Sequence, residues 1–251
     1  MAQIITIHSF RGGTGKSNTT ANVAGILASR GHRVGVVDTD IQSPGIHALF
    51  GVDQDQIEHS LNDYLWGKCA VEQTAVDVTK SLGTGVPGSV YLIPSSLRVG
   101  DISRALREGY DVGVLHEGLY SLVNALDLDH LMIDTHPGLN EETLLSMGIS
   151  HAVAIIMRPD HQDYAGTGVT VQVARRLRVP RLVIAVNKVP RTLDLGEVKR
   201  RVEETYSCKV AAVLPHSDEL MALASQGVFS LLFPDHPMTA YFNQLTDNLT
   251  A

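Results

Sequence analysis

The sequence contains very little cysteine and no long apolar run. Cys69 and Cys208 are the only cysteines among 251 residues, and neither stands in a metal-type spacing. A disulfide framework is therefore not expected, and reduced thiols in a bacterial cytosol are the simplest expectation. No run of about 18 apolar residues occurs, which argues against a membrane-spanning helix. The first residues also lack a basic stretch followed by an apolar one, so no secretory signal is expected.

Aromatic residues are also scarce, at 5%, whereas hydrophobic residues make up 44% of the chain. The core must therefore be built mainly from aliphatic side chains, as is typical of buried parallel strands. A chain of 251 residues is long enough for one large α/β domain.

The most informative segment that is present runs from Ser9 to Ser17 with the sequence Ser-Phe-Arg-Gly-Gly-Thr-Gly-Lys-Ser. An apolar run at 4–7 precedes it and a helical pattern follows it, which is the setting of a phosphate-binding loop. Glycines let backbone N–H groups converge on an anion, and the helix start adds the positive end of its dipole. Lys16 is expected at the terminal phosphates and the Ser17 hydroxyl on Mg²⁺. Phe10 stands where the general pattern has its first glycine.

Apolar runs alternate with helical patterns along the chain. Strand-type runs lie at 4–7, 33–38, 90–93, 131–134, 152–157, 182–187 and 210–214. Helical patterns follow residue 16 and cover 57–65, most of 101–126, 163–177 and 193–206. This alternation predicts a single α/β domain over residues 1–251, with a mostly parallel twisted sheet flanked by helices on both faces. The short loop at 80–89 is the only linker-like stretch.

Four segments resemble the ParA/MinD family of P-loop ATPases in sequence and in order. Residues 11–17 resemble its deviant Walker A loop, and 36–40 resemble its strand and DxD segment. Residues 131–138 resemble its Walker B strand and switch, and 186–188 its adenine-contacting segment. The chain is closer to ParA-like positioning ATPases than to membrane-binding MinD. One departure is that Arg11 replaces the family's first loop lysine.

The resemblance implies ATP and Mg²⁺ as cofactors and assigns roles to several residues. Asp134 would hold Mg²⁺ through water, Asp40 would orient the attacking water, and Asp38 would support that water or the metal. For Asp38, a cap or turn role is an equally good interpretation. The implied catalytic residues are Lys16, Asp40, Arg11 and Asp38. The implied nucleotide contacts are Gly12, Gly13, Thr14, Gly15, Lys16, Ser17, Asn18, Asn187 and Pro215.

Arg11, Asn187 and His136 each admit more than one interpretation. The family's lysine at position 11 reaches the partner's nucleotide across a dimer, and Arg11 could do the same with its planar donor fork or be a solvated loop residue. Asn187 could pair its amide with adenine, or cap the turn that it begins. His136, within the switch segment, is more simply a polar loop residue than a catalytic one.

Charge is distributed unevenly along the chain. The net charge is −7, yet residues 175–209 carry ten Lys and Arg against four Asp and Glu. This stretch is a candidate for non-specific DNA binding, which would associate the protein with the nucleoid, and two solvated helix faces are an equally good explanation. Residues 210–251 contain no Lys or Arg, so a basic membrane-binding helix of the MinD type is not expected there.

Three classes of function follow from the resemblance. The leading one is an ATP-dependent dimerisation switch that hydrolyses ATP and positions or partitions DNA or a protein assembly. Its expected partners are a second copy of the chain, an activator or cargo-adaptor protein, and DNA, but no membrane. The alternatives are an ATP-dependent metallocentre maturation factor, a membrane-surface regulator like MinD and, last, a ligase that activates a carboxylate. Fold alone does not decide among them.

Overall fold

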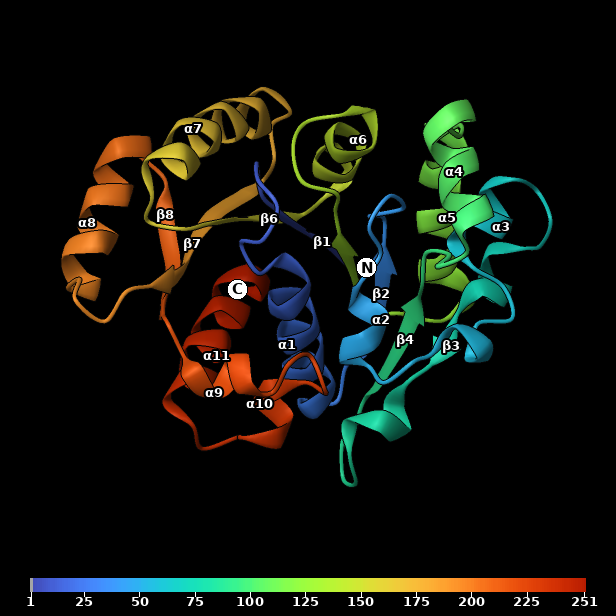
Figure 1. Ribbon diagram of the computed structural model, residues 1–251, viewed down its shortest axis with the longest axis horizontal. Helices are drawn as coiled ribbons and strands as arrows, with labels where there is room; N and C mark the ends of the chain where they lie inside the picture. The colour runs from blue at the N-terminus through green and yellow to red at the C-terminus, as the bar shows by residue number, and fades with distance from the viewer. Residues whose placement is uncertain (1) are drawn as a thin grey trace.

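The computed structural model describes residues 2–251 and contains one eight-stranded sheet in the order β3-β4-β2-β5-β1-β6-β7-β8 (Figure 1). All neighbouring strands are parallel except β3 and β4, which confirms the predicted mostly parallel α/β sheet. The strands are β1 (Gln3–His8), β2 (Arg33–Asp38), β3 (Val76–Asp77), β4 (Ser89–Ile93), β5 (His130–Asp134), β6 (Ala152–Met157), β7 (Arg181–Val189) and β8 (Lys209–Pro215).

Helices cover both faces of this sheet, as Figure 1 shows. The core side chains of β1 alternate accordingly, because Ile5 and Ile7 pack on the α1 side and Ile4 packs on the α5 side. The helices are α1 (Lys16–Ser29), α2 (Ile46–Leu49), α3 (Leu61–Leu65), α4 (Val99–Glu108), α5 (Val112–Ala125), α6 (Glu141–Ile149), α7 (His161–Arg176), α8 (Leu195–Tyr206), α9 (Asp218–Ala222), α10 (Phe229–Leu232) and α11 (Pro237–Thr250). Three 3₁₀ turns lie at Gln54–Gln56, Val71–Thr74 and Thr79–Leu82.

Two predicted helices differ from the structure. The pattern at 101–126 is divided into α4 and α5, because Gly109 adopts φ 67° and the Asp111 side chain caps α5 by accepting a hydrogen bond from the Gly113 N–H. In the pattern at 57–65, the α-helix begins only at Leu61. The two-residue antiparallel edge strand β3 was not predicted from the sequence.

The helix α11 packs into the core. Its side chains Met238, Phe242, Leu245 and Leu249 are buried in the cluster that includes α1. Within residues 2–251, no helix is long and apolar enough to cross a bilayer.

The arrangement of parallel strands brings the predicted site residues to one edge of the sheet. β5 pairs with both β1 and β2, so that Asp38 lies beside Asp134 in the register. The carboxyl ends of β1, β2 and β5 therefore meet where an open parallel sheet binds its ligands.

Candidate nucleotide site

The glycine-rich loop joins the end of β1 to the start of α1. Gly13 has φ 75° and Gly15 has φ 99°, and side chains with a Cβ are strained in this left-handed region. Gly15 occupies the N-cap position of α1, so the unpaired N–H groups of the first helical turn face the loop. This geometry suits an anion, as the sequence predicted.

Lys16 lies at the base of this loop and is nearly buried, with 7% of its surface exposed. Its Nζ donates to Ser9 Oγ at 3.2 Å, and Ser9 Oγ donates to the Arg11 carbonyl at 2.6 Å. Burial lowers the pKa of Lys16, and the nearby carboxylates oppose that shift. Phosphate oxygens would satisfy the ammonium better than a single hydroxyl does.

Asp134 and Asp38 form a buried pair of carboxyl groups at the ends of β5 and β2, each 1% exposed. Burial raises the pKa of Asp134 to about 6, against the opposing effects of Lys16 and two hydroxyls. Burial, with the charges of Asp134 and Asp40, raises the pKa of Asp38 well above its usual range. A bound cation would oppose these shifts and favour the ionised carboxylates.

Asp38 holds the loop that follows it. One of its carboxylate oxygens accepts from the Asp40 N–H at 3.0 Å, and the other accepts from the Gly45 N–H at 3.3 Å. These contacts support the turn interpretation of Asp38, while its catalytic role stays a prediction.

Asp40 is paired with His136 of the switch segment. The distance between His136 Nδ1 and Asp40 Oδ1 is 2.7 Å, and the same oxygen accepts from the Ser43 N–H at 3.1 Å. The side chain of Asp40 remains 17% exposed, so it is accessible to water. Asp40 is thus held between the loop after β2 and the segment after β5.

His8, which was not predicted, lies at the end of β1 and contacts the segment that follows β5. It is fully buried, its Nδ1 lies 2.7 Å from Thr135 Oγ1, and Thr135 Oγ1 donates to the Ile7 carbonyl. His8 must therefore donate from Nδ1. Burial, Lys16 and His136 lower the pKa of His8 to about 3, so this imidazole stays neutral.

A cavity of about 170 Å³ next to the glycine-rich loop gathers the residues predicted to contact the base. Leu220 and Met221 give it an apolar wall, which suits a flat aromatic ring. Its lining includes the predicted contacts Gly15, Asn18, Asn187 and Pro215.

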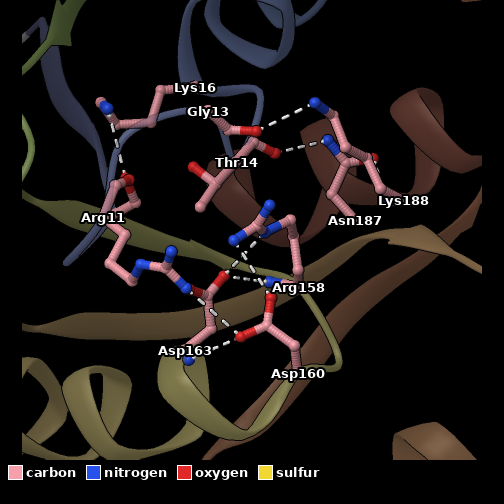
Figure 2. Close-up of polar contacts among 10 residues, drawn as sticks. Arg11, Gly13, Thr14, Lys16, Arg158, Asp160, Asp163, Asn187 and Lys188 are labelled. Atoms are coloured by element: carbon pink, nitrogen blue, oxygen red, sulfur yellow. Dashed lines mark hydrogen bonds and ion pairs between the residues drawn. The ribbon is translucent and has the colours of Figure 1, made fainter.

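Asn187 and Lys188 connect this cavity to the glycine-rich loop through hydrogen bonds (Figure 2). Asn187 Nδ2 donates to the Thr14 carbonyl at 2.8 Å, and Lys188 Nζ donates to the Gly13 carbonyl at 2.9 Å. Asn187 Oδ1 also accepts from the Lys188 N–H. The amide thus has a structural role, and its predicted contact with adenine stays a prediction.

Arg11 forms ion pairs within its own chain. Its Nη1 lies 3.4 Å from Asp160 Oδ1 and 3.2 Å from Asp163 Oδ1, at the start of α7 (Figure 2). The Arg11 side chain is thus paired within its own chain while 36% of its surface remains exposed. Both interpretations of Arg11, as a contact across a dimer and as a solvated loop residue, stay predictions.

The residues present fit Mg²⁺ bound largely through water. In the described part of the chain, no three His, Cys, Asp or Glu side chains lie close enough to hold a metal by themselves. A divalent cation beside the Ser17 hydroxyl would favour the ionised form of Asp38 and Asp134, whose pKa values burial raises. The assignments of Ser17 and Asp134 remain predictions.

A second cavity, of about 270 Å³, has His136 among its lining residues. Its walls come from the loop after β2, the junction of α4 and α5, and the start of α6, and they include Thr39, Tyr110 and Glu142. Glu142 is 5% exposed and accepts from the Tyr110 hydroxyl at 3.2 Å.

The basic stretch at 175–209 does not form one free patch. Arg175 donates to the carbonyls of Tyr206 and Ser207, and Arg200 is paired with Glu197 and Glu204. Five cations form no ion pair with other described residues and no side-chain hydrogen bond: Arg176, Arg178, Lys199, Arg201 and Lys209. Of these, Arg201 lies over the ring of Tyr164.

Comparison with known proteins identifies the family. A family model described as an AAA domain (AAA_31) matches residues 2–180. An uncharacterised ATP-binding protein of Methanocaldococcus jannaschii is 27% identical over 239 residues, which span 94% of this chain and 83% of that protein. An iron–sulfur cluster carrier protein of Methanococcus maripaludis is 32% identical over 186 residues, 73% of this chain and 59% of that protein.

One solved structure is similar to this protein over almost the whole chain. The septum site-determining protein MinD of Pyrococcus horikoshii, crystallised with Mg-ADP, superposes with a TM-score of 0.78 at 21% identity, over 98% of this chain and 95% of that one. The chain belongs to the AAA-domain family of P-loop proteins, and its fold is that of the MinD- and ParA-like ATPases.

Proposed function

We propose that this protein is an Mg²⁺-dependent ATPase whose ATP-bound form dimerises and positions or partitions a cargo. The observation that supports this best is the convergence of Lys16 and three carboxyl groups beneath a glycine-rich loop. A cavity of about 170 Å³ lined by Asn187 and Pro215 lies beside that loop, where a base would be expected.

Each residue has a distinct task in this proposal. Lys16 and the backbone N–H groups of the loop bind the terminal phosphates. Asp40, held by His136 and the Ser43 N–H, orients the attacking water, and Asp38 fixes the loop that carries Asp40. Mg²⁺ held by Ser17, and through water by Asp134, neutralises charge on the phosphates.

The proposed cargo role draws on the relatives. MinD is named a septum site-determining protein, and this is a precedent for a role in positioning a cargo. The iron–sulfur carrier relative is the precedent for the alternative of metallocentre maturation. That alternative is less favoured, because the two cysteines stand in no common metal-binding motif: Cys69 follows α3 and the buried Cys208 directly precedes β8, and α3 and β8 lie at opposite sides of the molecule (Figure 1). A membrane-surface role is less favoured because α11 buries its apolar side chains in the core.

Titration of a fluorescent ATP analogue in the presence of Mg²⁺, followed by turnover, tests the proposal. Lys16→Ala should bind at least about tenfold more weakly, because it removes a charge-assisted hydrogen bond to phosphate. Asp40→Ala should bind normally, hydrolyse slowly and accumulate as a dimer with ATP on size-exclusion chromatography. Lys199→Ala, an exposed lysine on α8, is the matched control and should behave as wild type. Equal affinity in a folded Lys16→Ala variant would refute the assignment.

A further inference from the structure

Phe10 and Arg11, the two residues at which the phosphate-binding loop departs from its pattern, both contact α7 of the same chain. The Phe10 ring lies so close to Gly166 that a Cβ on Gly166 would overlap it. One turn earlier, the Arg11 Nη1 lies within 3.4 Å of the carboxylates of Asp160 and Asp163 (Figure 2). Both departures from the loop pattern therefore contact the same helix.

The carboxylates that receive Arg11 are fixed by other contacts. The Asp163 side chain is only 3% exposed and accepts from the Arg158 N–H at 2.8 Å and from Arg158 Nε at 3.3 Å. Asp160 caps α7 by accepting from the Asp163 N–H at 3.0 Å, and it pairs with Arg158 Nη2 at 3.1 Å. This preorganised site favours a long, charged donor at position 11.

The contacts of Arg11 continue toward the phosphate-binding lysine. The Arg11 carbonyl accepts from Ser9 Oγ at 2.6 Å, and Ser9 Oγ accepts from Lys16 Nζ at 3.2 Å. A shift of Arg11 would therefore displace the hydroxyl that holds Lys16.

We propose that Arg11 is a positioning residue within its own chain: with Phe10 it holds the phosphate-binding loop against α7 and so sets the place of Lys16. This role rests on the proposed nucleotide-binding function. It differs from the contact across a dimer that the resemblance implies for position 11. Nη1 alone makes both ion pairs, at 3.2 and 3.4 Å, so a lysine would have to bring its ammonium to the same point on a shorter side chain.

A double-mutant cycle on the affinity for a fluorescent ATP analogue tests the positioning role. Arg11→Ala and Asp163→Asn should each weaken binding about tenfold, and the double variant should be little worse than either one, because both remove the same contact. Arg11→Lys keeps the charge on a shorter side chain, so its affinity should lie between those of wild type and Arg11→Ala. The thermal midpoint should change little in Arg11→Ala, because Arg158 still pairs with both carboxylates. Arg200→Ala, which breaks exposed ion pairs on α8, is the control. Wild-type affinity and turnover in Arg11→Ala would overturn the proposal.

Mixing Arg11→Ala with Asp40→Ala separates action within one chain from action across a dimer. In a mixed dimer, the Arg11→Ala subunit keeps its own Asp40 and faces an intact Arg11 on its partner. With mixed dimers verified by differently tagged chains, we expect turnover no higher than the sum of the two variants alone. Turnover restored well above that sum would overturn the proposal in favour of the contact across the dimer. Absence of ATP binding by the wild-type protein would instead refute the proposed function itself.

Discussion

At the scale of single residues, Glu142 shows how burial next to the site makes stability depend on pH. Its carboxyl group accepts from the Tyr110 hydroxyl, while Oε1 has no hydrogen-bond partner among residues 2–251. Burial raises the pKa of Glu142 from 4.5 to about 7. Between these two values the unfolded chain releases a proton that the folded protein retains, so stability falls as the pH rises through this window.

Glu142→Gln should therefore stabilise the protein at pH 8 by up to about 3 kcal/mol, since one pKa unit corresponds to about 1.36 kcal/mol. The gain should shrink as the pH is lowered from 7 toward 4.5, where both states of the wild type are protonated. Urea unfolding followed at pH 5 and pH 8 measures the difference. Glu141→Gln, at the exposed neighbouring position, is the control. A variant less stable than wild type at both pH values would mean that the carboxylate makes a contact the fold requires.

The residues of the site were predictable where their chemistry follows from local sequence. Lys16, Asp134 and Asp40 were identified from motifs, and the structure brings them together. His8, Asp163 and Glu142 were missed because their importance comes from contacts more than 30 residues away in sequence. The signal that was available for α7 was Asp160 as an N-cap, but this gives no hint that Arg11 would pair with it.

At the scale of elements, α1 illustrates both the success and the limit of sequence patterns. Eleven of its 14 residues are buried, from Lys16 to Ala28, so it has no pronounced polar face. The motif at its start, rather than amphipathic periodicity, made it predictable. The elements that were missed are β3, α2, α6, α9, α10 and α11. None of them carries such a motif, and tertiary packing decides their boundaries.

Gly25 of α1 gives an element-scale prediction. A Cβ there would lie 2.8 Å from Val228 Cγ1 and 3.1 Å from Leu231 Cδ1, so α10 packs directly on the helix backbone. Gly25→Ala should destabilise the protein by about 1–3 kcal/mol through overpacking. Gly148→Ala is the matched control, because that exposed helical glycine has no atom within 4 Å of its added Cβ and should be neutral or gain up to about 1 kcal/mol. Chemical denaturation compares the two, and a stabilised Gly25→Ala would show that α10 moves away at little cost.

At the scale of the whole molecule, the proposed nucleotide site and the exposed cations near β7 and β8 lie at opposite ends of the parallel strands. The site occupies the carboxyl ends of β1, β2 and β5, whereas Arg176, Arg178 and Lys209 lie near the amino ends of β7 and β8. Charge asymmetry was evident from the sequence, with +6 at 175–209 against a total of −7. Its division into paired and free cations was only partly evident. Glu197 and Glu204 lie at helical spacing from Arg200 on α8, whereas the contacts of Arg175 with the Tyr206 and Ser207 carbonyls depend on the packing of α7 and α8.

The free cations make DNA binding a prediction for the ATP-bound dimer. One subunit offers a modest basic edge on an acidic body, and dimerisation would link two such edges, which raises affinity through effective concentration.

Each phosphate neutralised should contribute about −0.9 to the slope of log affinity against log salt. Arg176→Ala with Arg178→Ala should therefore weaken binding to all duplex sequences alike and flatten that slope by roughly two units per edge engaged. Arg200→Ala, whose guanidinium is already paired with Glu197 and Glu204, should have a smaller effect. Gel shifts with ATP, with ADP and without nucleotide, each at two salt concentrations, provide the measurement. Binding that is absent in every nucleotide state would exclude DNA and leave a protein assembly or a membrane as the surface on which the proposed ATPase acts.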